Sequence, residues 1–193
     1  ISITADCNVL DIGCGEGIIS QYLFEKTKSN IFGLDFSHNC CVKASRLNPS
    51  CRFVEGLVEK LPFKESSFDF VIGNAILHHI SGLKEVTKEI IKVCKQQGYI
   101  VFIEPNRYNL LMILLGIAKK HERKTLCFST ARLCNLLRQQ LFEVRITPLN
   151  SYIYPYYTFP VGILKKIMEC IEDIFEIPII CTHYMIIAKR ENL

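Results

Sequence analysis

The sequence predicts an α/β protein with a doubly wound, mostly parallel sheet, and three observations support this. An apolar segment at 9–12 leads into a turn with three alternate glycines and then into a helix start. Later apolar segments end in acidic or amide residues, and amphipathic segments lie between them. With 193 residues, the chain can bury a substantial core, so we expect a single domain over 1–193.

The glycine turn, Asp-Ile-Gly-Cys-Gly-Glu-Gly at 11–17, predicts a ligand site. Glycine has no Cβ, so the backbone at Gly13 and Gly15 can adopt positive φ and approach a ligand closely. The next helix presents free N–H groups and the positive end of its dipole. Asp11 stands at the carboxyl end of the first strand, where open α/β sheets bind ligands. We therefore expect a polar or anionic ligand across this turn.

The glycine spacing separates two cofactors. A dinucleotide site needs Gly-x-Gly-x-x-Gly, and Ile18 stands where its third glycine would be. The pattern Asp-x-Gly-x-Gly-x-Gly instead resembles motif I of the class I S-adenosylmethionine-dependent methyltransferases. The resemblance implies S-adenosyl-L-methionine as cofactor, with Asp11 suited to its ammonium group. It places the methionine part of the cofactor beside Gly13, Cys14, Gly15 and Gly17.

A second carboxylate ends the second predicted strand, 31–35. Asp35 comes 20 residues after Gly15, where a carboxylate at the strand tip can accept hydrogen bonds from both ribose hydroxyls. The alternative role is a cap for the helix predicted at 38–47. We favour the ribose role because Ser37 already occupies the capping position. Phe36 is then expected near the adenine.

A further resemblance lies in Leu-Pro-Phe at 61–63 and Ser-Phe-Asp-Phe-Val at 67–71. These segments are similar to the "LPF…sFDxV" signature of the methyltransferase type 11 group, which includes quinone-biosynthesis methyltransferases. In that group an aspartate in the preceding loop usually bonds to the adenine amino group, and the next backbone N–H meets the ring. Leu57 stands at that aspartate's position, which leaves Val58 N–H and apolar contact. One lost charge-assisted hydrogen bond, worth roughly 1.5–3 kcal/mol, predicts modest cofactor affinity.

The fourth predicted strand, 68–73, is followed by two groups of candidate residues. Asn74 is expected to hold the cofactor's amino group through its carbonyl or side chain. The segment Ala-Ile-Leu-His-His-Ile at 75–80 matches the family's "lhH" segment. This implies that His79 lines the methyl-transfer chamber as a general base. Capping of the next helix by the histidine pair is an equal alternative.

An amphipathic helix is predicted at 83–94, with Gly98 as its end and a fifth strand at 99–103. Glu104 and Asn106 follow this strand at the carboxyl edge. We expect them either to face the methyl acceptor or to cap their loop.

The methyltransferase resemblance covers about 8–104, so we take 1–104 as the cofactor-binding half. Beyond it, only the class topology applies. That topology implies a Rossmann-like seven-stranded sheet of order 3-2-1-4-5-7-6, with an antiparallel last strand beside the fifth. The matching segments are a helix at 130–140 and strands at 142–147 and 182–189.

Two insertions, 105–128 and 151–180, are expected to form a cap that determines the substrate. The first contains an apolar stretch at 110–118 followed by a basic cluster, and the second combines tyrosines with an amphipathic helix. Both favour a small-molecule acceptor that is apolar or lipid-like. The plainer alternative is that the two segments pack on each other. Peripheral contact with a membrane surface is a third reading.

Charge and cysteine content exclude several other classes. A net charge of +4, evenly spread, is too weak to indicate nucleic-acid binding. The 10 cysteines show no Cys-x-x-Cys spacing, so we predict no metal and mostly buried thiols in a reducing, cytoplasmic compartment. The longest stretch without Asp, Glu, Lys or Arg, 146–164, contains three prolines and is a poor membrane span. The chain opens almost directly on its first strand, which suggests a fragment without a secretory leader.

The function expected from these features is methyl transfer from S-adenosyl-L-methionine to a small acceptor (EC 2.1.1.-). Transfer from a sulfonium is an in-line displacement for which alignment supplies much of the rate, and no metal is needed. Two alternatives stay open. One is a nicotinamide-binding oxidoreductase, on the strength of the glycine turn and Asp35. The other is a catalytically silent scaffold with the same fold, suggested by Leu57.

Overall fold

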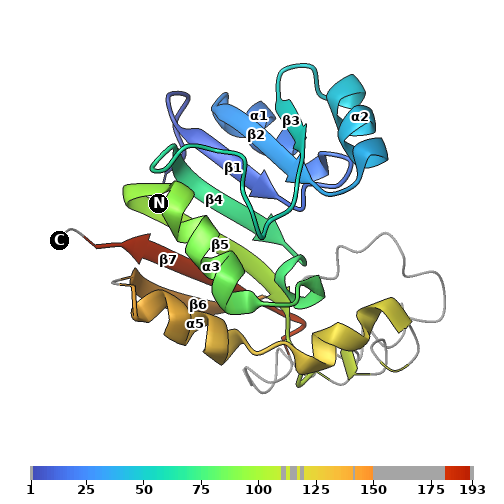
Figure 1. Cartoon of the computed structure of the whole chain (residues 1–193), viewed down its shortest axis with the longest axis vertical. Coiled ribbons are helices and arrows are strands. Elements are labelled where there is room, and N and C mark those ends of the chain that lie inside the picture. The colour runs from blue at the N-terminus through green and yellow to red at the C-terminus, as the bar shows by residue number, and fades with distance from the viewer. Residues whose placement is uncertain are drawn as a thin grey trace.

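The computed structural model describes residues 2–109, 112–113, 117, 120–140, 142–149 and 181–191. Within these ranges a seven-stranded sheet has the order β3-β2-β1-β4-β5-β7-β6 (Figure 1). Strand β7 runs antiparallel to both β5 and β6, and the other neighbours are parallel. The predicted Rossmann-like sheet and its order are confirmed. The predicted insertion at 151–180 lies outside the described residues, and that at 105–128 is described only in part.

The elements follow the predicted order along the chain. The strands are β1 (Asn8–Ile12), β2 (Asn30–Asp35), β3 (Arg52–Glu55), β4 (Phe68–Asn74), β5 (Cys94–Pro105), β6 (Phe142–Leu149) and β7 (His183–Arg190). The described α-helices are α1 (Ile18–Thr27), α2 (His38–Leu47), α3 (Leu83–Val93) and α5 (Thr130–Arg138), and the 3₁₀ helices are η1 (Leu77–His79) and η2 (Lys120–Cys127).

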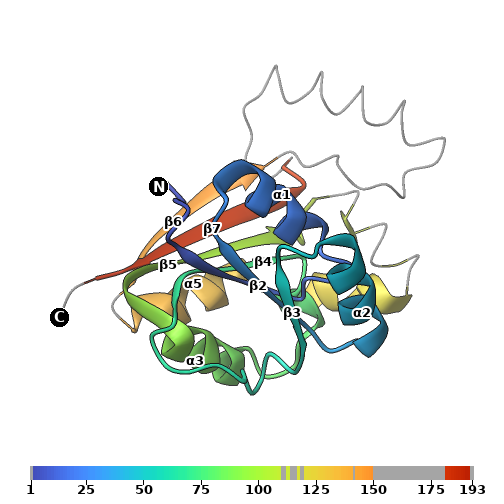
Figure 2. The same ribbon diagram turned by 90° about the horizontal axis from the view of Figure 1, so that it is seen from above.

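Side-chain alternation in the strands directs two apolar layers to opposite faces of the sheet. Leu10 and Ile12 of β1 pack in the larger cluster, which includes Ile90 of α3 and Leu137 of α5. Val9 belongs to a second cluster, against which apolar side chains of α1 pack. Figure 2 accordingly shows α3 and α5 on one side of the sheet and α1 on the other. The sheet is therefore covered on both faces, as expected for near-continuous apolar strands.

Parallel pairing brings the ends of three strands to one edge. Ile12 of β1 lies opposite Leu34 of β2 and also opposite Gly73 of β4. The turns that follow these strands therefore leave the sheet side by side. Figure 1 shows η1 and η2 at this same edge, where the antiparallel strand β7 begins.

The junction between α3 and β5 differs from the prediction. Helix α3 ends at Val93, and Cys94 has extended backbone angles and pairs with Phe68 of β4. The pairing register then shifts, so that Tyr99 lies opposite Phe70. Gly98 is part of this irregularity and does not end the helix. A Cβ at Gly98 would lie 2.9 Å from the carbonyl oxygen of Lys95, so the close backbone approach requires glycine.

Asp11 is a buried carboxyl group on the α1 side of the sheet. Its place two residues after Val9 in β1 directs it towards α1, where Ser20 Oγ donates a 2.6 Å hydrogen bond to Asp11 Oδ2. Burial raises the pKa of Asp11 from 3.8 to about 7, opposed by the Ser20 hydrogen bond and reinforced by the charge of Asp35. Ionised Asp11 therefore destabilises the folded chain.

Removal of this charge should change how stability depends on pH. The folded-state pKa of Asp11 lies above the unfolded value, so the wild type loses stability as pH rises from about 4 to about 7. The loss is on the order of 4 kcal/mol relative to Asp11→Asn, as measured by urea unfolding at several pH values. The exposed control Glu143→Gln should follow the wild-type curve. Parallel curves for wild type and Asp11→Asn would contradict an ionisable, buried Asp11.

Gln97 offers a second test of stability, because its φ of 61° lies in the left-handed region that favours glycine. We expect Gln97→Gly to raise the free energy of unfolding by about 1 kcal/mol, since the strain outweighs the entropy cost of glycine. The neighbouring Gln96 has no such φ, and Gln96→Gly should lower the free energy by about 0.5–1 kcal/mol. Both side chains are exposed. Urea denaturation that moves the two variants in the same direction would refute the interpretation.

Candidate functional site

The glycine turn after β1 adopts the positive φ values that its sequence predicts. The φ angles are 69° at Gly13 and 53° at Gly15. The amides of Gly13 and Cys14 both donate to the carbonyl oxygen of Leu34, at 2.7 and 3.1 Å. These bonds hold the turn against the end of β2 and fix its path at the edge of the sheet.

The glycines of the turn differ in the free space around them. A Cβ at Gly13 would lie 2.7 Å from the side chain of Ile76, whereas a Cβ at Gly15 would meet nothing within 4 Å. Cys14 is buried between them, and burial raises the pKa of its thiol far above the ordinary value, so the thiol is neutral. The open side of the turn is therefore at Gly15. Gly17, at the start of α1, faces Phe53 and Asn48.

Asp35 lies directly against the glycine turn. Its Oδ2 accepts a 2.9 Å hydrogen bond from Gly15 N, and its Oδ1 accepts a 2.9 Å bond from Ser37 N. The predicted cap is also present, since Ser37 Oγ accepts from Cys40 N at the start of α2. Each carboxylate oxygen keeps acceptor capacity beyond its single backbone bond. The structure thus brings Asp35 and the turn together, and the ribose role stays a prediction.

Apolar side chains stand exposed on the same edge of the sheet. Phe36 follows β2 and is 73% exposed, and Leu57 follows β3 and is 59% exposed. Strands β2 and β3 are parallel with Asp35 opposite Glu55, so both residues follow strands that end together. Val58, which follows Leu57 in the sequence, is buried. This exposed apolar pair suits the flat face of an adenine ring.

The turn after β4 is fixed by the end of β5. Asn74 closes β4 opposite Ile103, and its side chain is partly buried. Ala75 takes a positive φ of 53°, and its amide donates a 2.8 Å hydrogen bond to the carbonyl oxygen of Ile103. Ile76 then packs against Gly13. The position of Asn74 at the site edge therefore depends on a sharp turn that β5 holds in place.

A buried carboxylate anchors this turn from within. Glu104 is fully buried, and its Oε1 accepts hydrogen bonds from the amides of Ile76 and Leu77 at 3.0 and 2.8 Å. Its Oε2 lies 2.8 Å from His78 Nδ1. Of the two roles predicted for Glu104, the loop-capping one is therefore observed. The side chain that pairs with it is His78, which is buried, whereas His79 is exposed.

Sequence reasoning did not find this pair. Two adjacent histidines gave no reason to prefer His78 to His79. The signal for a buried pair was Glu104, near the end of β5, which is the neighbour of β4. The catalytic role of His79 stays a prediction. His79 lies at the surface, and its carbonyl oxygen accepts a 2.7 Å hydrogen bond from Lys124 Nζ.

Further polar side chains are buried where β5 and β7 meet. Asn106 donates to the carbonyl oxygen of Cys181 at 2.9 Å and accepts from the amide of Tyr108, which is a loop-capping role. His183 lies opposite Pro105, and burial, followed by the charge of His78, lowers its pKa to about 4. His183 is therefore neutral near pH 7. These contacts join the end of β5 to the start of β7.

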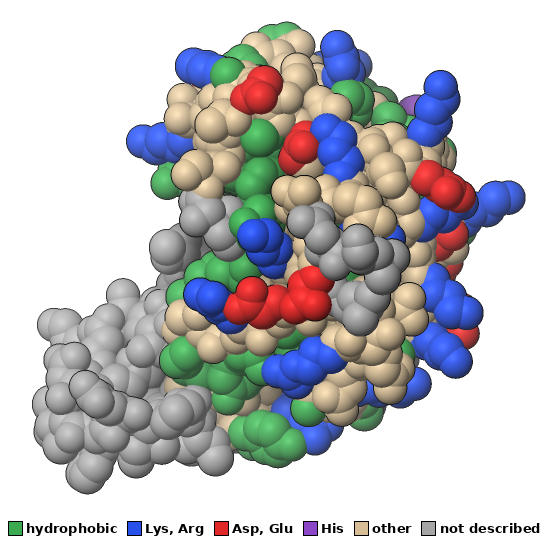
Figure 3. All heavy atoms as spheres, turned by 90° about the vertical axis from the view of Figure 1, so that its left-hand side faces the viewer, with side chains coloured by type: hydrophobic (Ala, Val, Ile, Leu, Met, Phe, Trp, Pro, Cys, Tyr) green, Lys and Arg blue, Asp and Glu red, His purple; other side chains and the backbone are tan. Residues whose placement is uncertain are grey.

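The described residues contain neither a metal-binding cluster nor a membrane-spanning helix. Among them, no group of three or more His, Cys, Asp and Glu side chains could hold a metal ion. In the same part of the chain, no helix has the length and apolar character needed to cross a membrane. On the face shown in Figure 3, Lys and Arg side chains are interspersed with Asp and Glu.

Comparison with known proteins identifies the first half of the chain. Residues 10–102 match a family model described as a methyltransferase domain. The human protein named arginine-hydroxylase NDUFAF5, mitochondrial, is 36% identical over 94 residues, which are 49% of this chain and 27% of that protein. The uncharacterized methyltransferase YcgJ of Bacillus subtilis is 30% identical over 110 residues, 52% of this chain and 43% of YcgJ. The matched segments thus span less than half of these relatives.

Solved structures extend the likeness to the whole fold. The crystal structure of Bacillus subtilis YcgJ aligns with a TM-score of 0.68 at 18% identity, covering 100% of this chain and 95% of that one. A geranyl diphosphate C-methyltransferase from Streptomyces coelicolor, in complex with Mg²⁺, geranyl diphosphate and S-adenosyl-L-homocysteine, aligns at 0.72 and 17% identity, covering 99% and 76%. With the family match, these show a methyltransferase fold. Residues 10–102 therefore match the methyltransferase domain family, and the chain has the fold of the solved methyltransferases described above.

Proposed function

We propose that the protein transfers a methyl group from S-adenosyl-L-methionine to a small, apolar or lipid-like acceptor. The observation that carries this proposal is the contact between Asp35 and Gly15 N, at the open side of the glycine turn. It puts a carboxylate where a ribose needs acceptors, next to a backbone that a ligand can approach. The family match over 10–102 and the fold support the same cofactor.

The residues at this edge divide the work of holding the cofactor. Asp35 would accept from the ribose, while Phe36, Leu57 and Val58 would pack around the adenine. The turn at 13–17 and Asn74 would flank the methionine part, and Asp11 lies buried on the α1 side of the sheet, bound to Ser20. The cofactor itself supplies an electrophilic methyl group. The chain's task is to align the acceptor and exclude water, which can provide much of the rate.

Two similar proteins bear on the nature of the acceptor. The Streptomyces neighbour is titled a C-methyltransferase in complex with geranyl diphosphate, an apolar chain with an anionic end, which favours an amphipathic acceptor. The human relative is named an arginine-hydroxylase, so relatives of this fold also carry other reactions. A general base at His79 and a peripheral membrane contact near 110–124 stay predictions. Transfer of a labelled methyl group, rather than gain of oxygen, would separate the two reaction classes.

Titration with S-adenosylhomocysteine tests the cofactor assignment. The wild type should release heat in calorimetry, and Asp35→Ala should bind at least about tenfold more weakly because it removes charge-assisted acceptors. The exposed carboxylate variant Glu143→Ala should bind like the wild type. NADH should produce no heat. An unchanged affinity of Asp35→Ala would refute the ribose role, and a silent wild type would favour the scaffold alternative.

A gain-of-affinity variant tests the same assignment without the risk of a damaged turn. Leu57 is exposed and stands where the type 11 group usually has an adenine-binding aspartate. Leu57→Asp should therefore tighten S-adenosylhomocysteine binding by at least about tenfold through one charge-assisted hydrogen bond. Leu47→Asp is the matched control, because Leu47 is equally exposed at the end of α2. Equal affinities for wild type and Leu57→Asp would place the adenine elsewhere.

A further inference from the structure

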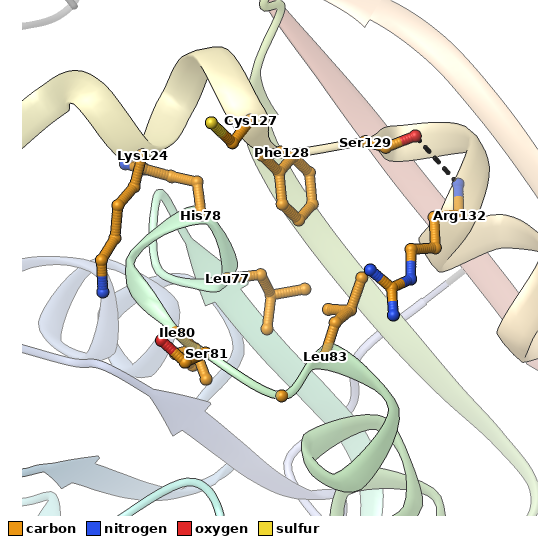
Figure 4. Close-up of a pocket in the computed structure, with 11 residues that line it drawn as sticks. Leu77, His78, Ile80, Ser81, Leu83, Lys124, Cys127, Phe128, Ser129 and Arg132 are labelled. Atoms are coloured by element: carbon orange, nitrogen blue, oxygen red, sulfur yellow. Dashed lines mark hydrogen bonds between the residues drawn. The ribbon is translucent and has the colours of Figure 1, made fainter.

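A cavity of about 310 Å³ lies between η1 and the start of α3 on one side and η2 and the start of α5 on the other. Figure 4 shows its apolar walls, which come from both sides. Leu77 and Leu83 face Phe128 across the space, and Ile80 closes the lower rim. The lining begins three residues after Asn74, at the end of the sheet where β1, β2 and β4 also end. Its size suits part of a small organic molecule.

The two charged side chains in the described lining of this cavity are both cationic, although Glu85 Oε2 lies 3.2 Å from where a Cβ at the lining residue Gly82 would stand. Lys124 and Arg132 line it, and no Asp or Glu is among its lining residues. In Figure 4 the guanidinium group of Arg132 turns towards Leu83, and the Lys124 side chain lies on the opposite side of the space. Glu85 occupies the first turn of α3 but does not line the cavity. The cavity therefore combines an apolar floor with positive charge at two sides.

Two helix starts add to this positive potential. Helix α3 begins at Leu83 and α5 at Thr130, and residues at both starts line the cavity. The N-terminus of each helix carries a partial positive charge. Ser129 caps α5 by accepting from the amide of Arg132, which fixes the base of the Arg132 side chain. Lys124 uses one of its three donors on the His79 carbonyl oxygen and keeps two.

We infer that this cavity binds a carboxylate or phosphate group carried by an apolar molecule. The oxyanion lies at the Arg132 end of the cavity, beside the start of α5, and the apolar part packs on Leu77, Leu83 and Phe128. Lys124 adds positive charge from the opposite side. The inference rests on the proposed function, since it names the chemical class of the acceptor: an amphipathic anion anchored at the end of the sheet where β1, β2 and β4 also end. A neutral lipid-like acceptor would gain nothing from the two positive charges.

The test uses sodium octanoate as the probe in a ¹H–¹⁵N NMR titration of the full chain. We expect chemical-shift changes at the amides of Leu83, Ser129 and Arg132. Two simpler probes test the anionic group and the apolar chain separately. Inorganic phosphate supplies only the anion and 1-octanol only the chain, and each should bind at least about tenfold more weakly than octanoate, because each forfeits one of the two contacts.

Variants of the two cations complete the test. Arg132→Gln should weaken octanoate binding about fivefold, and the double variant with Lys124→Gln about tenfold or more, since exposed ion pairs contribute modestly. Arg138→Gln is the matched control, because Arg138 lies on the same helix, is exposed and does not line the cavity. It should bind octanoate like the wild type.

Three results would overturn the inference. They are no shift at the cavity amides with octanoate, equal binding of 1-octanol and octanoate, and equal effects of Arg132→Gln and Arg138→Gln. The first two use only the wild-type chain and do not depend on the folding of a variant. Calorimetry with S-adenosylhomocysteine on the same sample keeps the proposed function separate. Cofactor binding without octanoate binding would sink this inference and leave the methyltransferase assignment standing.

Discussion

The arrangement of the candidate site depends on one carboxylate that joins two loops. Asp35 accepts from the amide of the glycine turn after β1 and from the amide that precedes α2. Both bonds are charge-assisted and nearly buried, so they are strong compared with neutral hydrogen bonds. They add to the bonds from Gly13 and Cys14 to the Leu34 carbonyl oxygen in holding the open side of Gly15 against the end of β2. The ligand site is therefore as much a product of this pair of bonds as of the strands.

A second carboxylate plays a similar part on the other side of the sheet's edge. Glu104 binds two backbone amides and a histidine, and it thereby sets the turn after β4 against the end of β5. The two acids differ in exposure and role. Asp35 retains a small solvent-exposed fraction, whereas Glu104 is completely buried and has a structural role. The glycine turn and the turn after β4 are thus positioned by separate acids, and the two turns meet where Ile76 packs on Gly13.

Much of this could be predicted from the sequence, because short-range signals specify it. The glycine turn, the acid after β2 and the Ser37 cap each depend on chain-local geometry, and the structure places them as expected. The histidine pair shows the limit. Which of His78 and His79 turns inwards depends on the φ of Ala75 and on Glu104, 26 residues away from His78. The end of α3 likewise depends on a shift in pairing with β4, which periodicity does not encode.

The packing of Ile76 on Gly13 links two segments that lie far apart in the chain. A side chain at position 13 would overlap Ile76, and the same isoleucine lies 2.9 Å from where a Cβ at Gly73 would stand. The volumes at these three positions therefore add to a fixed total. A smaller residue at 76 would ease the overlap at 13 and 73, but a side chain at 73 would still meet Phe102 at 2.7 Å, and one at 13 would still be strained by its φ of 69°. Grafting the glycine turn into another protein of this fold would thus require residue 76 to travel with it.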